Sequence, residues 1–321
     1  MKAMSLSDLW RRPRSSTQSS IRSPRFRRLC METCEERRLL SIDLVSANPG
    51  LEAITGCGVS QNPSMSSDGR YVAFYSYASN LVPGDTNDSA DVFVKDLVSG
   101  TTTRVSTDNA GAQGNEDSYH PSISSDGRYV AFSSQASNLV PGDTNGYGDV
   151  FVKDLVSGRT TRVSTDTAGG QGSASSFYPP SIGNDGRYVA FASEASNLVL
   201  GDTNGGLDVF VKDLVSGTTI RVSTDSAGMQ GNYYSYGPSI SSDGRYVAFY
   251  SYASNLVPGD TNGFGDVFVK DFVSGTTTRV STDTAGVQGN SSSYEPSISS
   301  YGRYVAFYSD ASNLVLGDTN A

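Results

Sequence analysis

The sequence predicts an all-β fold, a β-propeller built from four-stranded antiparallel blades. Three observations predict it: a motif that recurs every 58 or 59 residues, four strand-like runs in each period, and a composition rich in turn formers and aromatics. Of the 321 residues, 36% are hydrophobic and 18% charged, with 34 glycines and 18 tyrosines. No apolar run approaches the roughly 20 residues that a membrane helix needs.

The repeat is clearest in a turn motif of the form Ser-Asp-Gly-Arg-Tyr. Such a fixed period is typical of solenoids, propellers or arrays. The five copies occupy residues 67–71, 125–129, 184–188, 242–246 and 300–304.

Each period contains four short runs rich in Val, Tyr, Phe and Thr, the residue types that favour strands. In the second period these runs cover residues 121–124, 128–133, 149–154 and 160–164. Asp-Gly between the first two runs supplies the positive φ that a tight hairpin needs. Four antiparallel strands per repeat form a propeller blade, and stacked blades bury each other's faces.

The repeats divide the chain into a leader, residues 1–40, and a propeller, residues 41–321. The predicted repeats are 61–118, 119–177, 178–235, 236–293 and a half repeat, 294–321. Residues 43–46 repeat the sequence of residues 96–99, so the N-terminal segment has the order of a missing half blade. We expect five blades, the last closed by N- and C-terminal halves. The alternative is a truncated array with an open edge.

The leader holds ten Lys and Arg residues and four acids, has no periodicity, and is expected to be disordered. Its end resembles the LEPR-XLL leader domain of large surface or secreted bacterial proteins. The matching residues are Glu35, Arg37, Leu39 and Leu40. Cys34 and Glu36 depart from the pattern, which has Leu and Pro there. The resemblance implies an exported protein that is periplasmic, cell-surface or extracellular; the alternative is a short amphipathic helix with no address.

The leader and the closing blade compete for the same residues. In the alignment of repeats, Leu39 and Leu40 fall where Val92 and Phe93 lie. If the leader is cleaved there, the fifth blade loses its third strand.

The repeats resemble the WD-repeat-like propeller blades of TolB-type bacterial proteins. The resemblance rests on Pro-Ser-Ile-Ser followed by Ser-Asp-Gly-Arg-Tyr-Val-Ala-Phe, as in 238–249, and on Asp-Val-Phe-Val-Lys-Asp, as in 266–271. It covers residues 61–321, with single-copy departures at Met65, Gly183 and Tyr301. It implies binding and assembly modules rather than enzymes.

Charge narrows the class of partner. The chain has a net charge of −9, and because the leader is basic, the propeller is strongly acidic. Such a body repels phosphates, which excludes nucleic acid, and attracts cations or basic partners. The three cysteines indicate neither a disulfide framework nor a zinc site.

The loop between the second and third strands carries an Asp-Thr-Asn motif with a further Asp. Oxygen ligands at this spacing match positions 1, 3 and 7 of a calcium loop. The alternative is that Asp85 and Asn87 form Asx-turns and cap backbone amides. Ca²⁺ is the one cofactor that the sequence suggests. Its candidate ligands are Asp85, Asn87, Asp91, Asp143, Asn145, Asp149, Asp202, Asn204, Asp208, Asp260, Asn262 and Asp266.

Two further recurrent features admit a structural and a functional interpretation. The arginine after each turn glycine either pairs with an Asp on the adjacent strand or joins its copies in an anion site. The copies are Arg70, Arg128, Arg187, Arg245 and Arg303. Aromatic residues in the connections either form a recognition rim or cover the blade ends. They are Phe177, Tyr178, Tyr233, Tyr234 and Tyr236.

Little in the sequence indicates catalysis. His120 is the only histidine, and no nucleophile elbow, zinc-protease motif or P-loop occurs. The sequence therefore predicts a non-catalytic exported or surface scaffold that binds a protein or a carbohydrate on its loop faces. One alternative is a calcium-stabilised structural module of a surface assembly. The other is a glycosidase-like hydrolase using Glu116, Glu194 and Glu295, the acids that differ between repeats.

Overall fold

The computed structural model describes residues 58–318 of the chain. They belong to the second of two compact units, 44–321, whereas the first unit is 1–43. The leader, its LEPR-XLL-like end and the N-terminal piece of the predicted fifth blade lie outside the described residues. The predictions for those segments stay predictions.

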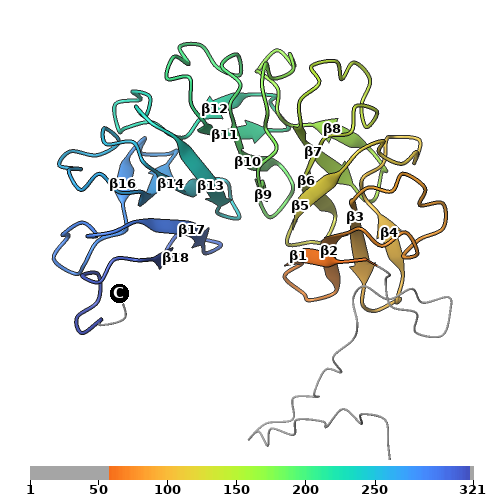
Figure 1. The fold of residues 1–321 in the computed structure, drawn as a ribbon, viewed down its shortest axis with the longest axis horizontal. Helices are drawn as coiled ribbons and strands as arrows, with labels where there is room; N and C mark the ends of the chain where they lie inside the picture. The colour runs from red at the N-terminus through yellow and green to blue at the C-terminus, as the bar shows by residue number, and fades with distance from the viewer. Residues whose placement is uncertain (1–57, 319–321) are drawn as a thin grey trace, which may run out of the picture. The chain divides into compact units, whose positions relative to one another are not determined.

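The described part is all-β, with 18 strands and no helix (Figure 1). The first blade comprises β1 (Ser60–Met65), β2 (Tyr71–Ser76), β3 (Asp91–Asp96) and β4 (Thr102–Arg104). The second comprises β5 (Ser118–Ile123), β6 (Tyr129–Ser134), β7 (Asp149–Asp154) and β8 (Thr160–Arg162). The third comprises β9 (Ser181–Ile182), β10 (Tyr188–Ser193), β11 (Asp208–Asp213) and β12 (Thr219–Arg221). The fourth comprises β13 (Ser235–Ile240), β14 (Tyr246–Ser251), β15 (Asp266–Asp271) and β16 (Thr277–Arg279). A half blade follows, with β17 (Ser293–Ile298) and β18 (Val305–Ser309).

Each four-stranded sheet is an antiparallel meander whose strand order follows the chain. In the second blade, Tyr129 pairs with Asp154 and Ser134 with Asp149, so β6 and β7 match along their whole length. The Asp-Gly turn before β6 forms as predicted, with Gly127 at a φ of 73°. A meander with such short turns places the long connections at one end of the blade and the tight turns at the other.

The first strand of each blade differs from its prediction. β5 begins at Ser118, three residues earlier than expected, because Ser118 and Tyr119 pair with the end of β6 across a bulge. His120 lies in this bulge with a φ of 53°. In the third blade β9 keeps only two residues, since Pro179 and Pro180 just before it have no N–H to donate. The fourth strand also ends two residues earlier than predicted.

The blades pack face to face through apolar side chains. Phe132 of β6 and Phe151 of β7 are fully buried, with ring centroids 5.9 Å apart. One core cluster joins Val92 and Val94 of the first blade to Val130 and Phe132 of the second. Because strands two and three are covered on both faces, they are apolar at nearly every position rather than at alternate positions.

Polar and close contacts also link neighbouring blades. The ring of Tyr71 covers the turn glycine Gly127 so closely that a Cβ there would lie 2.2 Å from it. Lys153, a buried residue of β7, donates to the Thr107 hydroxyl and the Asp108 carbonyl of the preceding blade. Turn residues of all five repeats line one cavity of about 350 Å³: Ser67, Ser125, Asn184, Ser242 and Ser300. The first-strand turns therefore converge, as in a propeller.

The half blade has no third strand in the described residues. Val305 and Phe307 of β18 are partly exposed, whereas their counterparts Val247 and Phe249 are fully buried. The all-β propeller of four-stranded blades is thus confirmed. Its closure as five blades involves residues before 58 and stays a prediction. Residues 58–318 contain no helix, and therefore none that is long and apolar enough to cross a membrane.

Candidate functional site

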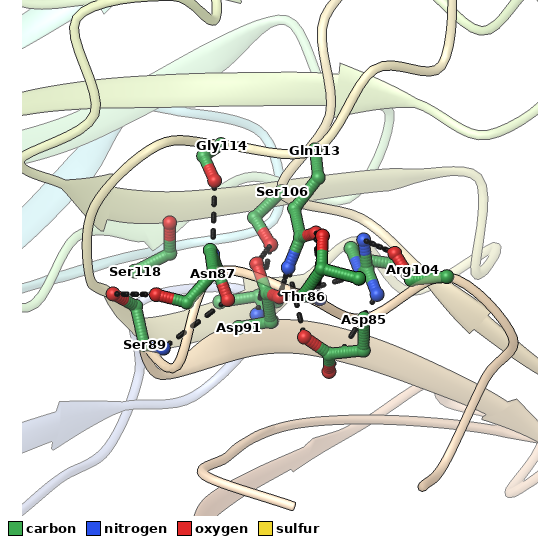
Figure 2. A network of polar contacts seen from close by, with 12 residues as sticks. Asp85, Thr86, Asn87, Ser89, Asp91, Arg104, Ser106, Gln113, Gly114 and Ser118 are labelled. Carbon is green, nitrogen blue, oxygen red and sulfur yellow. Dashed lines mark hydrogen bonds and ion pairs between the residues drawn. The ribbon is translucent and has the colours of Figure 1, made fainter. Parts of the chain in front are cut away.

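In each complete blade, the loop between the second and third strands carries an aspartate and an asparagine two residues apart, and we call it the Asp-Asn loop. In the first blade this loop, with Asp85 and Asn87, forms a buried polar network (Figure 2). The carboxylates of Asp85 and Asp91 both contact Arg104, at 3.5 Å from its Nη2 and 3.3 Å from its Nε respectively. The Gln113 amide donates to both carboxylates at 2.8 Å, and the Ser106 hydroxyl donates to Asp91. The Asp91 side chain is not exposed at all. The sequence-predicted acids therefore do meet, around an arginine.

The other complete blades repeat the arginine with its two carboxylates, whereas the glutamine donates to the carboxylates only in the first and third blades and accepts from the arginine in the second and fourth. In the second, Nη1 of Arg162 lies 3.1 Å from both Asp143 and Asp149 and donates to Gln171 at 2.7 Å. The third and fourth blades place their arginines 3.2 to 3.6 Å from the equivalent carboxylates. The corresponding residues there are Asp202, Asp208, Arg221 and Gln230, then Asp260, Asp266, Arg279 and Gln288.

The asparagine of each loop builds the turn. Asn87 accepts a hydrogen bond from the Ser89 amide at 3.1 Å, which closes an Asx-turn, and donates to the Gly114 carbonyl at 2.9 Å. Asn145, Asn204 and Asn262 make the same pair of contacts. The Asx-turn alternative thus describes the asparagines. It does not describe Asp85, which pairs with Arg104 instead.

This network does not fit a calcium ion. Ca²⁺ needs six to eight oxygen ligands, and here both carboxylates already have a guanidinium as their counter-charge. Residues 58–318 contain no group of three or more His, Cys, Asp or Glu side chains that could hold a metal. Burial raises the pKa of Asp91 to about 6, against the opposing effects of Ser106 and Arg104. The Arg104 guanidinium is the counter-charge of the Asp91 carboxylate.

The acid at the far end of the third strand belongs to a different contact. Asp96 accepts two hydrogen bonds from Arg70, at 3.0 and 2.8 Å. The Arg70 guanidinium also lies 4.8 Å from the centre of the Tyr71 ring. The same bidentate pairs are Arg128–Asp154, Arg187–Asp213 and Arg245–Asp271. These hydrogen bonds hold the pKa of each aspartate well below its usual range. The four arginines are thus engaged in pairs rather than in a shared anion site.

The opposite end of the blades, where first strands begin and second strands end, carries an aromatic surface that we call the tyrosine-rich face. Tyr119 is at its centre in the second blade, with ring centroids 5.0 Å from Tyr75, 6.2 Å from Tyr77 and 5.5 Å from Phe177. These four residues come from three successive blades. His120 lies among them, 6.0 Å from Tyr119.

A second group of rings continues the face over the fourth blade and the half blade. Tyr236 stacks on Tyr250 at 5.1 Å, and Tyr250 lies 5.8 Å from Tyr294. Tyr233 and Tyr234 are 4.6 Å apart in the connection before the fourth blade. The remaining members of the face are Tyr178, Tyr252 and Tyr308. The aromatic residues of the connections thus lie together with further rings from the second strands, so the aromatic surface is larger than the connections alone indicated.

The sequence-predicted candidates for catalysis are dispersed on or near this face. Glu116, Glu194 and Glu295 are exposed and come from three different repeats. His120 is half-buried, its Nδ1 has no hydrogen-bond partner, and burial lowers its pKa. The imidazole packs among aromatic rings, and within residues 58–318 no carboxylate accepts or donates a hydrogen bond at its Nδ1.

The part of the face that comes from the second strands was not expected from the sequence; it includes Tyr75, Tyr77, Tyr250 and Tyr252. A signal was available in the alignment of the repeats. Most large differences between copies fall at strand-one starts, strand-two ends and the long connections, whereas the turn and core sequences are nearly identical.

Comparison with known proteins adds only fold-level information. No protein-family model matches the sequence, and no curated protein matches it either. Solved structures similar to this chain include TolB from Acinetobacter baumannii, with 17% identity and a TM-score of 0.47 over 78% of this chain and 49% of that one. A putative TolB from Agrobacterium tumefaciens has 18% identity and a TM-score of 0.48, over 81% of this chain and 73% of that one. A structure from an analysis of two prolyl endopeptidases has 14% identity and a TM-score of 0.47, over 79% of this chain and 32% of that one.

TolB proteins are thus among the similar structures, as the sequence resemblance predicted. This chain spans about half the length of the Acinetobacter protein. At these identities the likeness concerns the fold alone.

Proposed function

We propose that this protein is a non-catalytic, exported binding scaffold that holds a protein or carbohydrate ligand on its tyrosine-rich face. The proposal rests on the positions at which the repeats differ in sequence. The blades keep the same core, turns and ion pairs, and they differ mainly at the end that bears the aromatic rings. A purely structural array has no need for differences confined to one end.

The composition of the face supports recognition. Tyr77, Tyr233 and Tyr252 are 50%, 54% and 39% exposed, and each also contacts another ring. Tyrosine offers a large apolar surface and a hydroxyl at little conformational cost, which suits a binding site. Tyr178 and Glu194 add a hydrogen bond of 3.0 Å at the same end.

The repeats also support a non-catalytic role. Catalysis by paired carboxylates needs two acids in different environments. The buried aspartates of this chain are instead copies of one environment, each neutralised by an arginine. The glutamates that do differ between repeats are exposed.

Titration against a defined ligand panel tests the proposal. The panel holds soluble glucan, xylan, chitin and mannan hexasaccharides and a set of acidic, neutral and basic octapeptides, and binding is measured by calorimetry. We expect at least one ligand to bind and to lose at least tenfold in affinity in the double variant Tyr233→Ala, Tyr252→Ala. Tyr301→Ala is the matched control, because Tyr301 is 86% exposed but lies in a tight turn at the other end. Equal loss in both variants, or no binding at all, would contradict the proposal.

A further inference from the structure

We infer that the tyrosine-rich face recognises a cationic peptide segment, one that presents several arginine or lysine side chains. This inference rests on the proposed binding function and names the chemistry of its ligand. It is carried by the charges at this face, by the contacts that occupy the chain's own cations, and by the aromatic rings.

The segments that build the face contain acids and no cations. They are residues 58–62, 75–79, 115–121, 133–137, 173–180, 192–196, 232–238, 250–254, 290–296 and 308–312. None of them includes a lysine or an arginine, and together they hold Glu116, Asp117, Glu194, Glu295 and Asp310. The same segments supply 11 of the chain's 18 tyrosines. The face is therefore both aromatic and negative.

The cations of the described residues are engaged elsewhere. Four arginines form the bidentate pairs at the tight-turn end, and four others contact the paired carboxylates of the Asp-Asn loops. Three lysines, Lys153, Lys212 and Lys270, are buried and donate to the preceding blade, and Lys95 is also buried and donates to the Gly100 carbonyl at 2.7 Å. Arg159 and Arg303 belong to the tight turns. The acids of the face thus have none of these cations as a neighbour along the chain.

The acids lie beside rings that can accept a cation. Glu194 is exposed and accepts the hydrogen bond of Tyr178, whose pKa is raised to about 12 by burial and by this contact, so the phenol stays a neutral donor. Glu295 is also exposed and has a φ of 48°, in the bulge that follows Tyr294. A guanidinium or ammonium over a tyrosine ring is attracted by the negative face of the ring. The chain uses this contact itself where Arg70 covers Tyr71.

The extent of the face favours a peptide over a single small cation. Rings contact one another from Tyr75 to Phe177 and again from Tyr233 to Tyr308, across successive blades. Such a surface offers several places for a cationic side chain. A neutral carbohydrate would gain from the rings but not from the acids, and long-range attraction by the acidic body would speed only the encounter with a basic partner.

The test uses the full chain and a synthetic octapeptide of alternating arginine and serine, with citrulline in place of arginine as the neutral control peptide. Calorimetry at 50 and 300 mM NaCl measures the dissociation constants. We expect the arginine peptide to bind at least tenfold more tightly than the citrulline peptide and to weaken at the higher salt. The double variant Glu194→Gln, Glu295→Gln should lose about fivefold or more, and Tyr233→Ala should also weaken binding.

Asp185→Asn is the matched control for charge. Asp185 is exposed in the tight turn of the third blade, at the opposite end of β10 from Glu194, and asparagine can still accept the hydrogen bond from the Arg187 amide. This variant should bind like the unaltered chain, and circular dichroism checks that every variant folds. Equal loss in Asp185→Asn and the glutamate variant, equal binding of the two peptides, or no binding would overturn the inference. Tyrosine-dependent binding of a hexasaccharide alone would overturn it and leave the proposed scaffold function standing.

Discussion

Arg162 and Asp149 form a buried ion pair, with Nη1 of the arginine 3.1 Å from Oδ2 of an aspartate that has no exposed surface. Asp154, at the other end of the same strand, pairs with Arg128, whose side chain is 43% exposed. One strand thus carries two aspartate–arginine pairs in opposite environments. The contrast allows their contributions to stability to be separated within one blade.

Removing the buried arginine should be much more costly than removing the exposed one. We expect Arg162→Met to lower the free energy of unfolding by about 3 kcal/mol, because it leaves a buried carboxylate without its counter-charge. Arg128→Met should cost clearly less, since the Arg128 side chain is 43% exposed and water screens its attraction to Asp154. Urea unfolding followed by circular dichroism measures both. Equal costs would contradict the assignment of Arg162 as the internal cation of this loop.

Calcium should not stabilise the protein. The paired carboxylates already have a guanidinium as their counter-charge, and the asparagine oxygens are used in turns. We expect the same thermal midpoint in excess CaCl₂ as in chelator, with MgCl₂ as the control for ionic strength. A site that binds only the folded state would add about 2.7 kcal/mol at one hundred times its dissociation constant. A saturable rise in the thermal midpoint with Ca²⁺ alone would contradict this prediction and support the alternative of a calcium-stabilised structural module.

Most of the blade, but only part of the sites, could be predicted from the sequence. Strands, turns and the Arg128–Asp154 pair follow from short-range pattern, because a residue beside a tight turn faces the adjacent strand. The role of Arg162 was missed because it does not flank a tight turn, and periodicity does not say which way its side chain or that of Asp149 points. The recurrence of that arginine, and of Gln171 after it, in every complete repeat was the available signal.

The tyrosine-rich face was underestimated for a related reason. Tyr75 and Tyr250 stand in strand patterns that look like core, and Tyr75 does belong to a core cluster, but both rings also contact a tyrosine of the following repeat at the end of the strand. First-strand boundaries were missed because the bulge at His120 hides the pairing of Ser118 and Tyr119 from the alternation pattern.

Stability should respond to pH in two opposite ways. Burial raises the pKa of Asp91 to about 6, so its ionisation costs stability as the pH rises from about 4 through 6. Hydrogen bonds from arginine lower the pKa of Asp96 and its three counterparts, so their stabilisation is present above about pH 4 and is lost as the pH falls below it. The thermal midpoint should therefore be highest near pH 4 to 5, decline modestly toward pH 7 and fall steeply below pH 4.

Thermal scans between pH 2.5 and 8 measure this profile. Asp91→Asn should flatten the decline above pH 5 and keep the steep acid limb, because it removes only the buried group. A midpoint that rises steadily from pH 4 to 7, in either protein, would show that the buried carboxylates are not the groups that resist ionisation.

Closure of the fifth blade predicts a specific partner for Arg303. Its four counterparts each pair with the last residue of a third strand, and the half blade has no such strand among residues 58–318. In the alignment of repeats that residue is Asp43, and the register of β14 on β15 pairs Tyr246 with Asp271. If the N-terminal segment completes the blade, Asp43 should pair with Arg303 and the amides of β18 should be protected from exchange.

Hydrogen exchange of Val305–Ser309 in the full chain, against a chain that starts at residue 58, measures that protection. We expect the truncated chain to exchange faster in β18 while β6 is unchanged. Arg303→Asp should reproduce part of this loss, and adding Asp43→Arg should restore protection, because the exchanged pair keeps opposite charges. Charge exchange of Arg245 and Asp271 is the control, since that pair is present in the fourth blade at 2.8 Å. If β18 exchanges equally fast with and without the N-terminal segment, the array has an open edge, and the alternative of a truncated array is correct.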